Sequence, residues 1–251
     1  MKNLKNNKMT HQLKIKLLGL FAALLILAVF FVERIPQSNA YHQFADGRMM
    51  ANVPNFYNVL SNLPFLVFGI MGILAILQKE KTALWKNRLF FFVGILLTGF
   101  GSAYYHWNPC IDTLVWDRLP MVMAFMPFFT LIIGEYIDEK WGEQLLFPAL
   151  FLGISSVVYW YWTEMKGIGD LRAYALVQFL PLLLMPIIMF SFELKLGKTN
   201  IYWTMIGIYA LAKVFETYDA QVFAYFPISG HSLKHLTGAS AAFWLWKQQK
   251  N

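Results

Sequence analysis

The sequence predicts an all-α, polytopic membrane helix bundle with a seven-helix core and one extra N-terminal span. Of its 251 residues, 58% are hydrophobic and only 14% are charged, whereas soluble domains have about 45–50% apolar and about 25% charged residues. The apolar residues form continuous runs, which favours helices over the alternating strands of a membrane barrel. This composition excludes a disordered chain, a coiled coil and an ordinary soluble enzyme.

Eight apolar segments have the length of about 20 residues that a helix needs to cross a bilayer. They are residues 17–33, 58–77, 89–107, 115–134, 144–162, 172–192, 201–217 and 230–246. The loops between them are too short for a second domain. We therefore divide the chain into residues 1–40, a basic tail with a signal-anchor span, and residues 41–251, a seven-helix membrane domain.

The first span has a second interpretation. A basic tail, an apolar core at residues 17–32 and the sequence Ser38-Asn39-Ala40 together resemble a secretory signal with its cleavage site. The apolar core is longer than that of a usual signal, which favours an uncleaved anchor. Cleavage would leave the seven-helix core in the same orientation.

Basic residues predict that both termini face the cytoplasm. The N-terminal tail carries Lys2, Lys5 and Lys8, and the C-terminal tail carries Lys247 and Lys250. With both tails inside, most of the basic loop residues also lie inside, as membrane proteins require. The net charge of +7 is then explained by topology and not by nucleic-acid binding. The single cysteine, Cys110, excludes an intramolecular disulfide and a multi-cysteine metal cluster.

Five polar residues in the predicted spans suggest a catalytic site, because such residues are costly in a membrane. Ser102 and His106 are four residues apart and share a helix face. His231 and His235 have the same spacing, which lets two imidazoles bind one metal ion. Asp117 begins the next span after His106. The predicted topology places all five at similar depth near the outer surface.

Three histidines with one open coordination position form a typical catalytic zinc site. Bound zinc lowers the pKa of water to about 7, an aspartate can take up its proton and a serine can stabilise the oxyanion. A histidine pair alone is also compatible with a helix-packing contact or a haem site. The remaining histidines, His11 and His42, are assigned no role.

Other polar residues in the spans can be explained by contacts within the helix bundle. The spacing of Asn58, Ser61 and Asn62 favours hydrogen bonds between helices, with support of the site as the alternative. A simple pair on one helix accounts for Lys213 and Glu216. We place Asp219 in the following outer loop.

Four segments in this order resemble the alkaline ceramidase family, within a superfamily of seven-helix membrane hydrolases that includes the progestin and adipoQ receptors. The resemblance covers about residues 41–246, and residues 44–48 and 54–58 look closest to the bacterial branch. The segments are Asn58-Val59-Leu60-Ser61-Asn62, Gly101-Ser102 with His106, Asp117-Arg118-Leu119-Pro120-Met121, and His231 to His235.

The resemblance implies a zinc-dependent intramembrane hydrolase. His106, His231 and His235 would be the ligands of Zn²⁺, and Ser102 and Asp117 the catalytic pair. A membrane lipid would be the substrate: the amide of a ceramide-like lipid, or an ester, is hydrolysed to a fatty acid and, from an amide, a long-chain amine. The resemblance also implies a multi-pass protein of the bacterial inner membrane, with its active site toward the outer side.

Eukaryotic members of this family also carry an acidic calcium-binding motif. That motif is incomplete here, because Asn55 replaces its glutamate and Asp46 is the only acid before it. The alternative function is a non-enzymatic, receptor-like or lipid-sensing protein with a structural zinc site. A small transporter is a third reading, but the sequence shows no internal repeat to support it.

Overall fold

The computed structural model describes residues 9–195 and 199–250, and Lys2, Lys5 and Lys8 lie outside these ranges. Its described part is helical and contains no strand, which confirms the predicted all-α class. The elements are α1 (His11–Val29), η1 (Asn39–His42), α2 (Phe56–Leu60), α3 (Leu63–Leu77), α4 (Trp85–Trp107), α5 (Ile111–Tyr136), α6 (Glu139–Met165), α7 (Arg172–Ser191), α8 (Thr199–Thr217), α9 (Asp219–Tyr225) and α10 (Gly230–Lys250).

Each of the eight predicted spans corresponds to a long helix or, for residues 58–77, to the consecutive pair α2 and α3. Six of these segments, α1 through α7 with α2 and α3 counted together, are long and apolar enough to cross a membrane. The chain is therefore a multi-pass membrane protein. Helices α8 and α10 are of similar length, but they carry the charged and histidine side chains discussed below.

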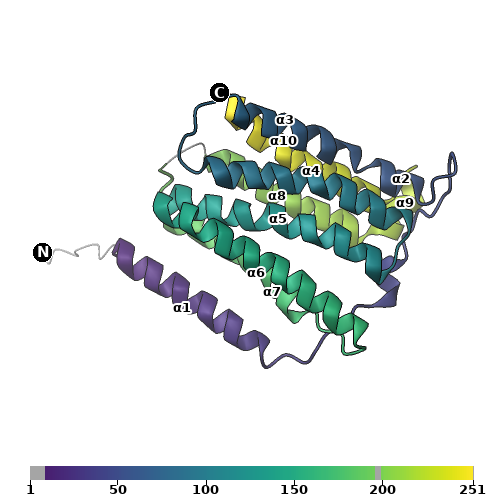
Figure 1. Cartoon of the computed structure of the whole chain (residues 1–251), viewed down its shortest axis with the longest axis horizontal. Helices are drawn as coiled ribbons and strands as arrows, with labels where there is room; N and C mark the ends of the chain where they lie inside the picture. Colours follow the sequence, from purple (N-terminus) through teal and green to yellow (C-terminus); the bar gives the residue numbers. More distant parts are fainter. Residues whose placement is uncertain (1–8, 196–198, 251) are drawn as a thin grey trace, which may run out of the picture.

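Helix α5 is the centre of the bundle. It packs against α4, α6 and α7, while α10 packs against α3 and α8 (Figure 1). In the most apolar 18-residue stretch of α5, 72% of the residues are buried. Helix α1, in contrast, lies at the edge of the bundle, packs on α7 and has no buried residue. Helix α1 begins and α10 ends at the same end of the bundle, and α2 and α9 lie at the opposite end.

The segment predicted as one helix over residues 58–77 is broken at Ser61 and Asn62. Pro64 has no backbone N–H and cannot complete a helical hydrogen bond to Leu60. The side chain of Asn62 donates a 2.8 Å hydrogen bond to the carbonyl of Asn58 and so competes with the helical pattern. The predicted span is thus confirmed as the apolar segment Phe56–Leu77, which consists of two consecutive helices and not of one.

The predicted first span also differs at its ends, because α1 stops at Val29 and the chain continues without helix to η1. This connection is tied to the bundle. The carbonyl of Ile35 accepts a 2.8 Å bond from the backbone of Leu171, and the backbone of Gln37 donates a 2.8 Å bond to Glu164 Oε1. The residues after α1 are thus part of the fold at the α2–α9 end.

Arg88 lies inside α4 and forms a buried ion pair with Glu135 of α5 at 2.6 Å. Pairing compensates the charge of each partner inside the bundle. This ion pair belongs to the packing between α4 and α5 and is separate from the histidine site described next.

Candidate metal centre

The structure brings His106, His231 and His235 together. One nitrogen of each imidazole lies within 4.8 Å of the others, and all three side chains are buried. The Nε2 atoms of His106 and His231 are 3.2 Å apart. Phe44 covers the cluster, with its ring centroid 4.6 Å from those of both His106 and His231.

These three residues fit a metal ion by their chemistry and spacing. Neutral imidazoles supply one lone pair each, and zinc accepts such nitrogens in sites of three or four ligands. The close approach of two Nε2 atoms in a buried place suits a shared cation, which would satisfy both lone pairs. Among the described residues, this is the one group of three or more histidine, cysteine or acidic side chains with such spacing.

Asp219 fixes the start of α10, which carries two of the histidines. Its Oδ1 accepts a 2.6 Å hydrogen bond from the backbone of His231, and its Oδ2 accepts a 2.9 Å bond from Ala45. Gly230 permits this close packing, because a Cβ there would lie 2.3 Å from the carbonyl oxygen of Phe215. Sequence reasoning placed Asp219 in a loop without a role, since its partners are far away in the chain.

The polar face predicted on residues 58–62 contacts the site. Ser61 Oγ is 2.8 Å from His235 Nδ1, so Nε2 of His235 is left for a metal. Asn58 Oδ1 accepts a 2.8 Å bond from Ser232, which lies between the two histidines of α10. These residues therefore make hydrogen bonds between helices and also orient a histidine, so both readings of the sequence apply.

The side chains of Ser102 on α4 and Asp117 on α5 are neighbours and line the same cavity. Gly101 allows the two helices to approach, because a Cβ there would lie only 1.8 Å from the carbonyl oxygen of Trp116. Pro120 has no N–H to bond that carbonyl within α5. The glycine and the proline together position the serine beside the aspartate.

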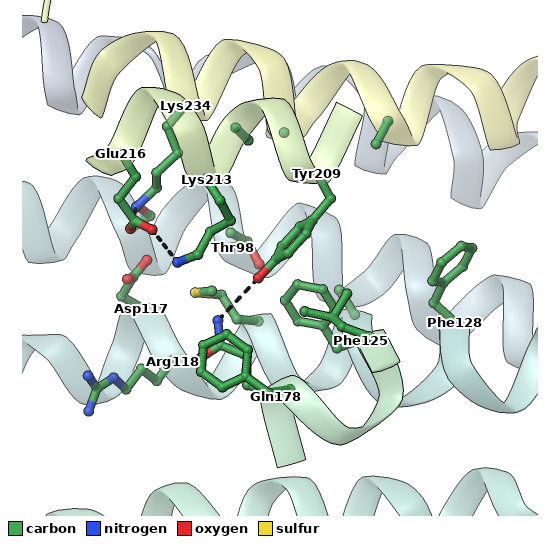
Figure 2. Close-up of a pocket in the computed structure, with 18 of the residues that line it drawn as sticks. Thr98, Asp117, Arg118, Phe125, Phe128, Gln178, Tyr209, Lys213, Glu216 and Lys234 are labelled. Atoms are coloured by element: carbon green, nitrogen blue, oxygen red, sulfur yellow. Dashed lines mark hydrogen bonds and ion pairs between the residues drawn. The ribbon is translucent and has the colours of Figure 1, made fainter. Parts of the chain in front are cut away.

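Ser102, Asp117 and His235 line one cavity of about 370 Å³. Figure 2 shows its polar side, where Asp117, Glu216 and Lys213 face a common space, and its apolar side, which includes Phe125 and Phe128. A cavity with one polar end and an apolar remainder is the shape that an amphiphilic ligand requires.

The cavity is lined by residues of α3, α4, α5, α7, α8 and α10, and α7 and α8 form one side of it. Helix α8 packs mainly on α10, and its Trp203 contacts Phe190 of α7 with 4.6 Å between ring centroids. A 3.4 Å hydrogen bond from Gln178 to Tyr209 connects α7 with α8 (Figure 2). Phe179 of α7 lines the cavity and is 47% exposed, so the cavity borders the outer surface along the line between these helices.

Sequence reasoning missed two charged contributions. Lys234 was not assigned a role, yet it lines the cavity and binds Glu216. Arg118 stacks on the ring of Trp160, with 4.0 Å from its Cζ to the ring centroid, and donates a 2.6 Å bond to Gln37. The sequence signal for Lys234 was its position within the His231–His235 segment.

The two histidines without a predicted role lie away from the cluster's ligand atoms. His42 Nδ1 is 2.9 Å from the hydroxyl of Tyr105, and burial, followed by the charge of Arg118, lowers its pKa. His11 packs against Phe192.

Asp46, the one acid of the incomplete calcium motif that the resemblance implies, binds an arginine. Both of its carboxylate oxygens accept bonds from Arg48, at 2.8 and 2.7 Å. Burial raises the pKa of Asp46, but the bonds from Arg48 outweigh it and hold the pKa below its ordinary value. Asn55 donates to the carbonyl of His106 at 2.9 Å. The guanidinium of Arg48 thus binds both oxygens of the Asp46 carboxylate, the atoms with which Asp46 would bind a calcium ion.

The fold and the site together define a multi-pass membrane protein with a buried, metal-compatible histidine cluster at one end of an amphiphilic cavity. The family model described as Ceramidase matches residues 46–219. The chain therefore belongs to the Ceramidase family. The match includes His106, Ser102 and Asp117 and ends before α10.

A similar protein is "Putative alkaline ceramidase dcd3A" of Dictyostelium discoideum, which is 27% identical over 105 residues. The aligned part covers 37% of this chain and 34% of that protein, so it spans about a third of the length of the relative.

Proposed function

We propose that the protein is a zinc-dependent membrane hydrolase that cleaves the amide bond of a ceramide-like lipid. The observation that carries the proposal is the position of the Ser102–Asp117 pair and His235 on one cavity, beside the other two histidines. Membership of the Ceramidase family supports the choice of a lipid amide.

His106, His231 and His235 would hold the metal, and bound zinc supplies Lewis-acid activation of the amide carbonyl and of the attacking water. Asp117 accepts a proton from that water as the new C–O bond forms. Ser102 donates a hydrogen bond to the oxygen that gains negative charge. Asp117 then returns the proton to the leaving nitrogen as the C–N bond breaks. One water is consumed, and a carboxylic acid and an amine are released.

The cavity suits a substrate that never leaves the membrane. Its apolar walls, with Phe125 and Phe128, would hold an alkyl chain while the amide lies near Asp117. A lateral route for the lipid from the bilayer would pass Phe179 of α7, which lines the cavity and is 47% exposed. Breaking the 3.4 Å contact between Gln178 and Tyr209 would widen it.

A receptor-like protein with structural zinc is less well supported. Structural zinc sites normally have four protein ligands, and catalytic ones keep a position open. Within the described residues the cluster has three histidines, and a carboxylate and a hydroxyl stand on the adjoining cavity. That arrangement favours a catalytic zinc site over a closed structural zinc site.

The test combines metal analysis with hydrolysis. We would purify the full chain in detergent and measure its metal by elemental analysis, for the wild type, His231→Ala and the control His11→Ala. Release of fatty acid from C16-ceramide and a panel of lipid amides and esters would be followed by mass spectrometry. We expect about one zinc per chain and hydrolysis in the wild type and the control, and neither in His231→Ala. Absence of zinc after its addition to the wild type, or hydrolysis by zinc-free protein, would refute the proposal.

A further inference from the structure

The cavity holds a charged cluster beyond the residues used in the proposed reaction. Glu216 of α8 receives two lysines: Lys234 of α10 at 2.8 Å through Oε1, and Lys213 of α8 through Oε2. All three line the cavity, and Figure 2 shows Lys213 and Glu216 facing the same space as Asp117.

The charges of this cluster do not cancel. Two ammonium groups share one carboxylate, which leaves one positive charge. On the facing helix, Arg118 formally balances Asp117. A divalent ion on three neutral imidazoles would add two further positive charges. Excess charge inside a membrane protein is costly and is usually associated with function, so the polar end of the cavity favours an anionic partner.

Lys213 is the most accessible member of the cluster. Its side chain is 40% exposed, against 20% for Glu216 and 19% for Lys234. An ammonium has three N–H donors, so Lys213 can keep its bond to Glu216 and donate to a ligand as well. Lys234, in contrast, is held between Glu216 and the His231 ring, 3.4 Å from Nε2.

The cluster is close enough to the histidines to contact the same ligand molecule. Three successive contacts lead from His231 to Lys234, then to Glu216 and then to Lys213. Because Lys213 lines the same cavity as Asp117 and His235, a ligand whose amide lies at the histidines could place a neighbouring group against the ammonium of Lys213.

We infer that the Lys213–Glu216–Lys234 cluster selects lipid amides that carry an anionic group next to the amide nitrogen, as in an N-acyl amino acid. Lys213 pairs with that anion, and Glu216 holds both lysines in place. The inference rests on the proposed function, since it assumes that a lipid amide is the substrate. It adds that an acidic headgroup is preferred over a neutral hydroxyl headgroup.

The test uses two probes with the same acyl chain, N-palmitoylglycine and N-palmitoylethanolamine, which differ in having a carboxylate or a hydroxymethyl group. Binding to zinc-loaded full-length protein is measured by calorimetry in neutral detergent micelles, in an Asp117→Asn background to prevent turnover. Lys213→Met removes the charge and Lys213→Arg keeps it. Lys247→Met is the matched control, because Lys247 is on α10 and stacks on Trp244.

We expect the parent to bind the glycine probe at least about tenfold more tightly, as one well-placed charge pair allows. Lys213→Met should abolish this preference, whereas Lys213→Arg and Lys247→Met should retain it. Equal affinities in the parent, or an unchanged preference in Lys213→Met, would overturn the inference. If Lys213→Met does not fold, the parent and Lys213→Arg still decide the question.

Hydrolysis by protein with intact Asp117 separates the two proposals. A binding preference without hydrolysis of either probe or of ceramide would contradict the proposed function and leave the headgroup preference standing. Hydrolysis with equal affinity for both probes would support the function and refute the preference.

Discussion

The hydroxyl of Ser61 lies 2.8 Å from Nδ1 of His235, although 174 residues separate them. This contact fixes the imidazole ring and leaves Nε2 toward the other histidines. Groups that orient metal-binding histidines commonly contribute to metal affinity. The break between α2 and α3 occurs at this serine, so the irregular backbone places a side chain that a straight helix would direct elsewhere.

Ser61→Ala should therefore weaken zinc binding by about 10- to 100-fold without removing a ligand. The measurement is competition with a chelator of known affinity, followed by elemental analysis. Ser155→Ala, on α6, is the control. Unchanged zinc affinity in Ser61→Ala would show that the hydroxyl has no part in orienting His235.

Asp117→Asn should lower kcat for the lipid amide by at least about 100-fold, because the amide side chain cannot accept the proton of water. Zinc content should stay at the wild-type level, since the three histidines are unchanged. The control is Asp112→Asn, on the same helix, where the carboxylate accepts a bond from Tyr161. Normal turnover in Asp117→Asn would rule out this residue as the base.

Gly101→Ala should destabilise the protein by about 1–3 kcal/mol, because the added methyl group overlaps the carbonyl of Trp116 and separates α4 from α5. Ser102 would move away from Asp117, so activity should fall as well. Thermal unfolding in detergent measures the first effect. Gly207→Ala on α8, where a Cβ meets nothing within 4 Å, should unfold at or above the wild-type temperature.

The loop before α7 gives a pH prediction. Hydrogen bonds from Arg172 hold the pKa of Asp170 at about 2, below its ordinary value. A carboxyl with a lowered pKa in the folded state stabilises the fold above its unfolded pKa of about 4, and this contribution is lost as the pH falls through about 2.

Asp170→Asn should accordingly lower the unfolding temperature by a few degrees at pH 7, with the difference from the wild type shrinking between about pH 4 and pH 2. Unfolding would be followed across this range in an acid-stable detergent. A difference that does not depend on pH would mean that the ion pair does not contribute in this way.

The connection after α1 predicts the fate of the N-terminal segment. Gln37 accepts a 2.6 Å bond from the buried Arg118, and Ile35 lines the cavity. Cleavage after Ala40 would remove both. We expect the mature protein to keep the bond between Ala40 and Tyr41, which peptide mass spectrometry of purified protein would detect. A protein beginning at Tyr41 would instead show that the anchor is a cleaved signal.

Much of the fold could be predicted because continuous apolar runs alone determine where a membrane helix lies. The break at Ser61 was missed, since it depends on Pro64 and on the side-chain bond of Asn62. The histidines, Ser102 and Asp117 were found through helical spacing and a common predicted depth. The structure brings these residues together, while their catalytic roles stay predictions.

Residues that act through distant partners could not be found in this way. Asp219 contacts the backbone of Ala45 and His231, and no local pattern shows such a bond. In the sequence, Lys234 is a charged residue between two histidines with no evident partner. The structure shows that its partner is Glu216 of α8. A cluster of charges from two helices can be identified only when the packing of those helices is known.

The lateral route proposed for the substrate, past the exposed Phe179, also determines how the hydrolysis must be assayed. A substrate that arrives sideways is encountered by diffusion in two dimensions. Its effective concentration is then its mole fraction in the surrounding leaflet, so adding inert lipid or detergent should slow the reaction even when the total amounts of enzyme and substrate in the tube are constant.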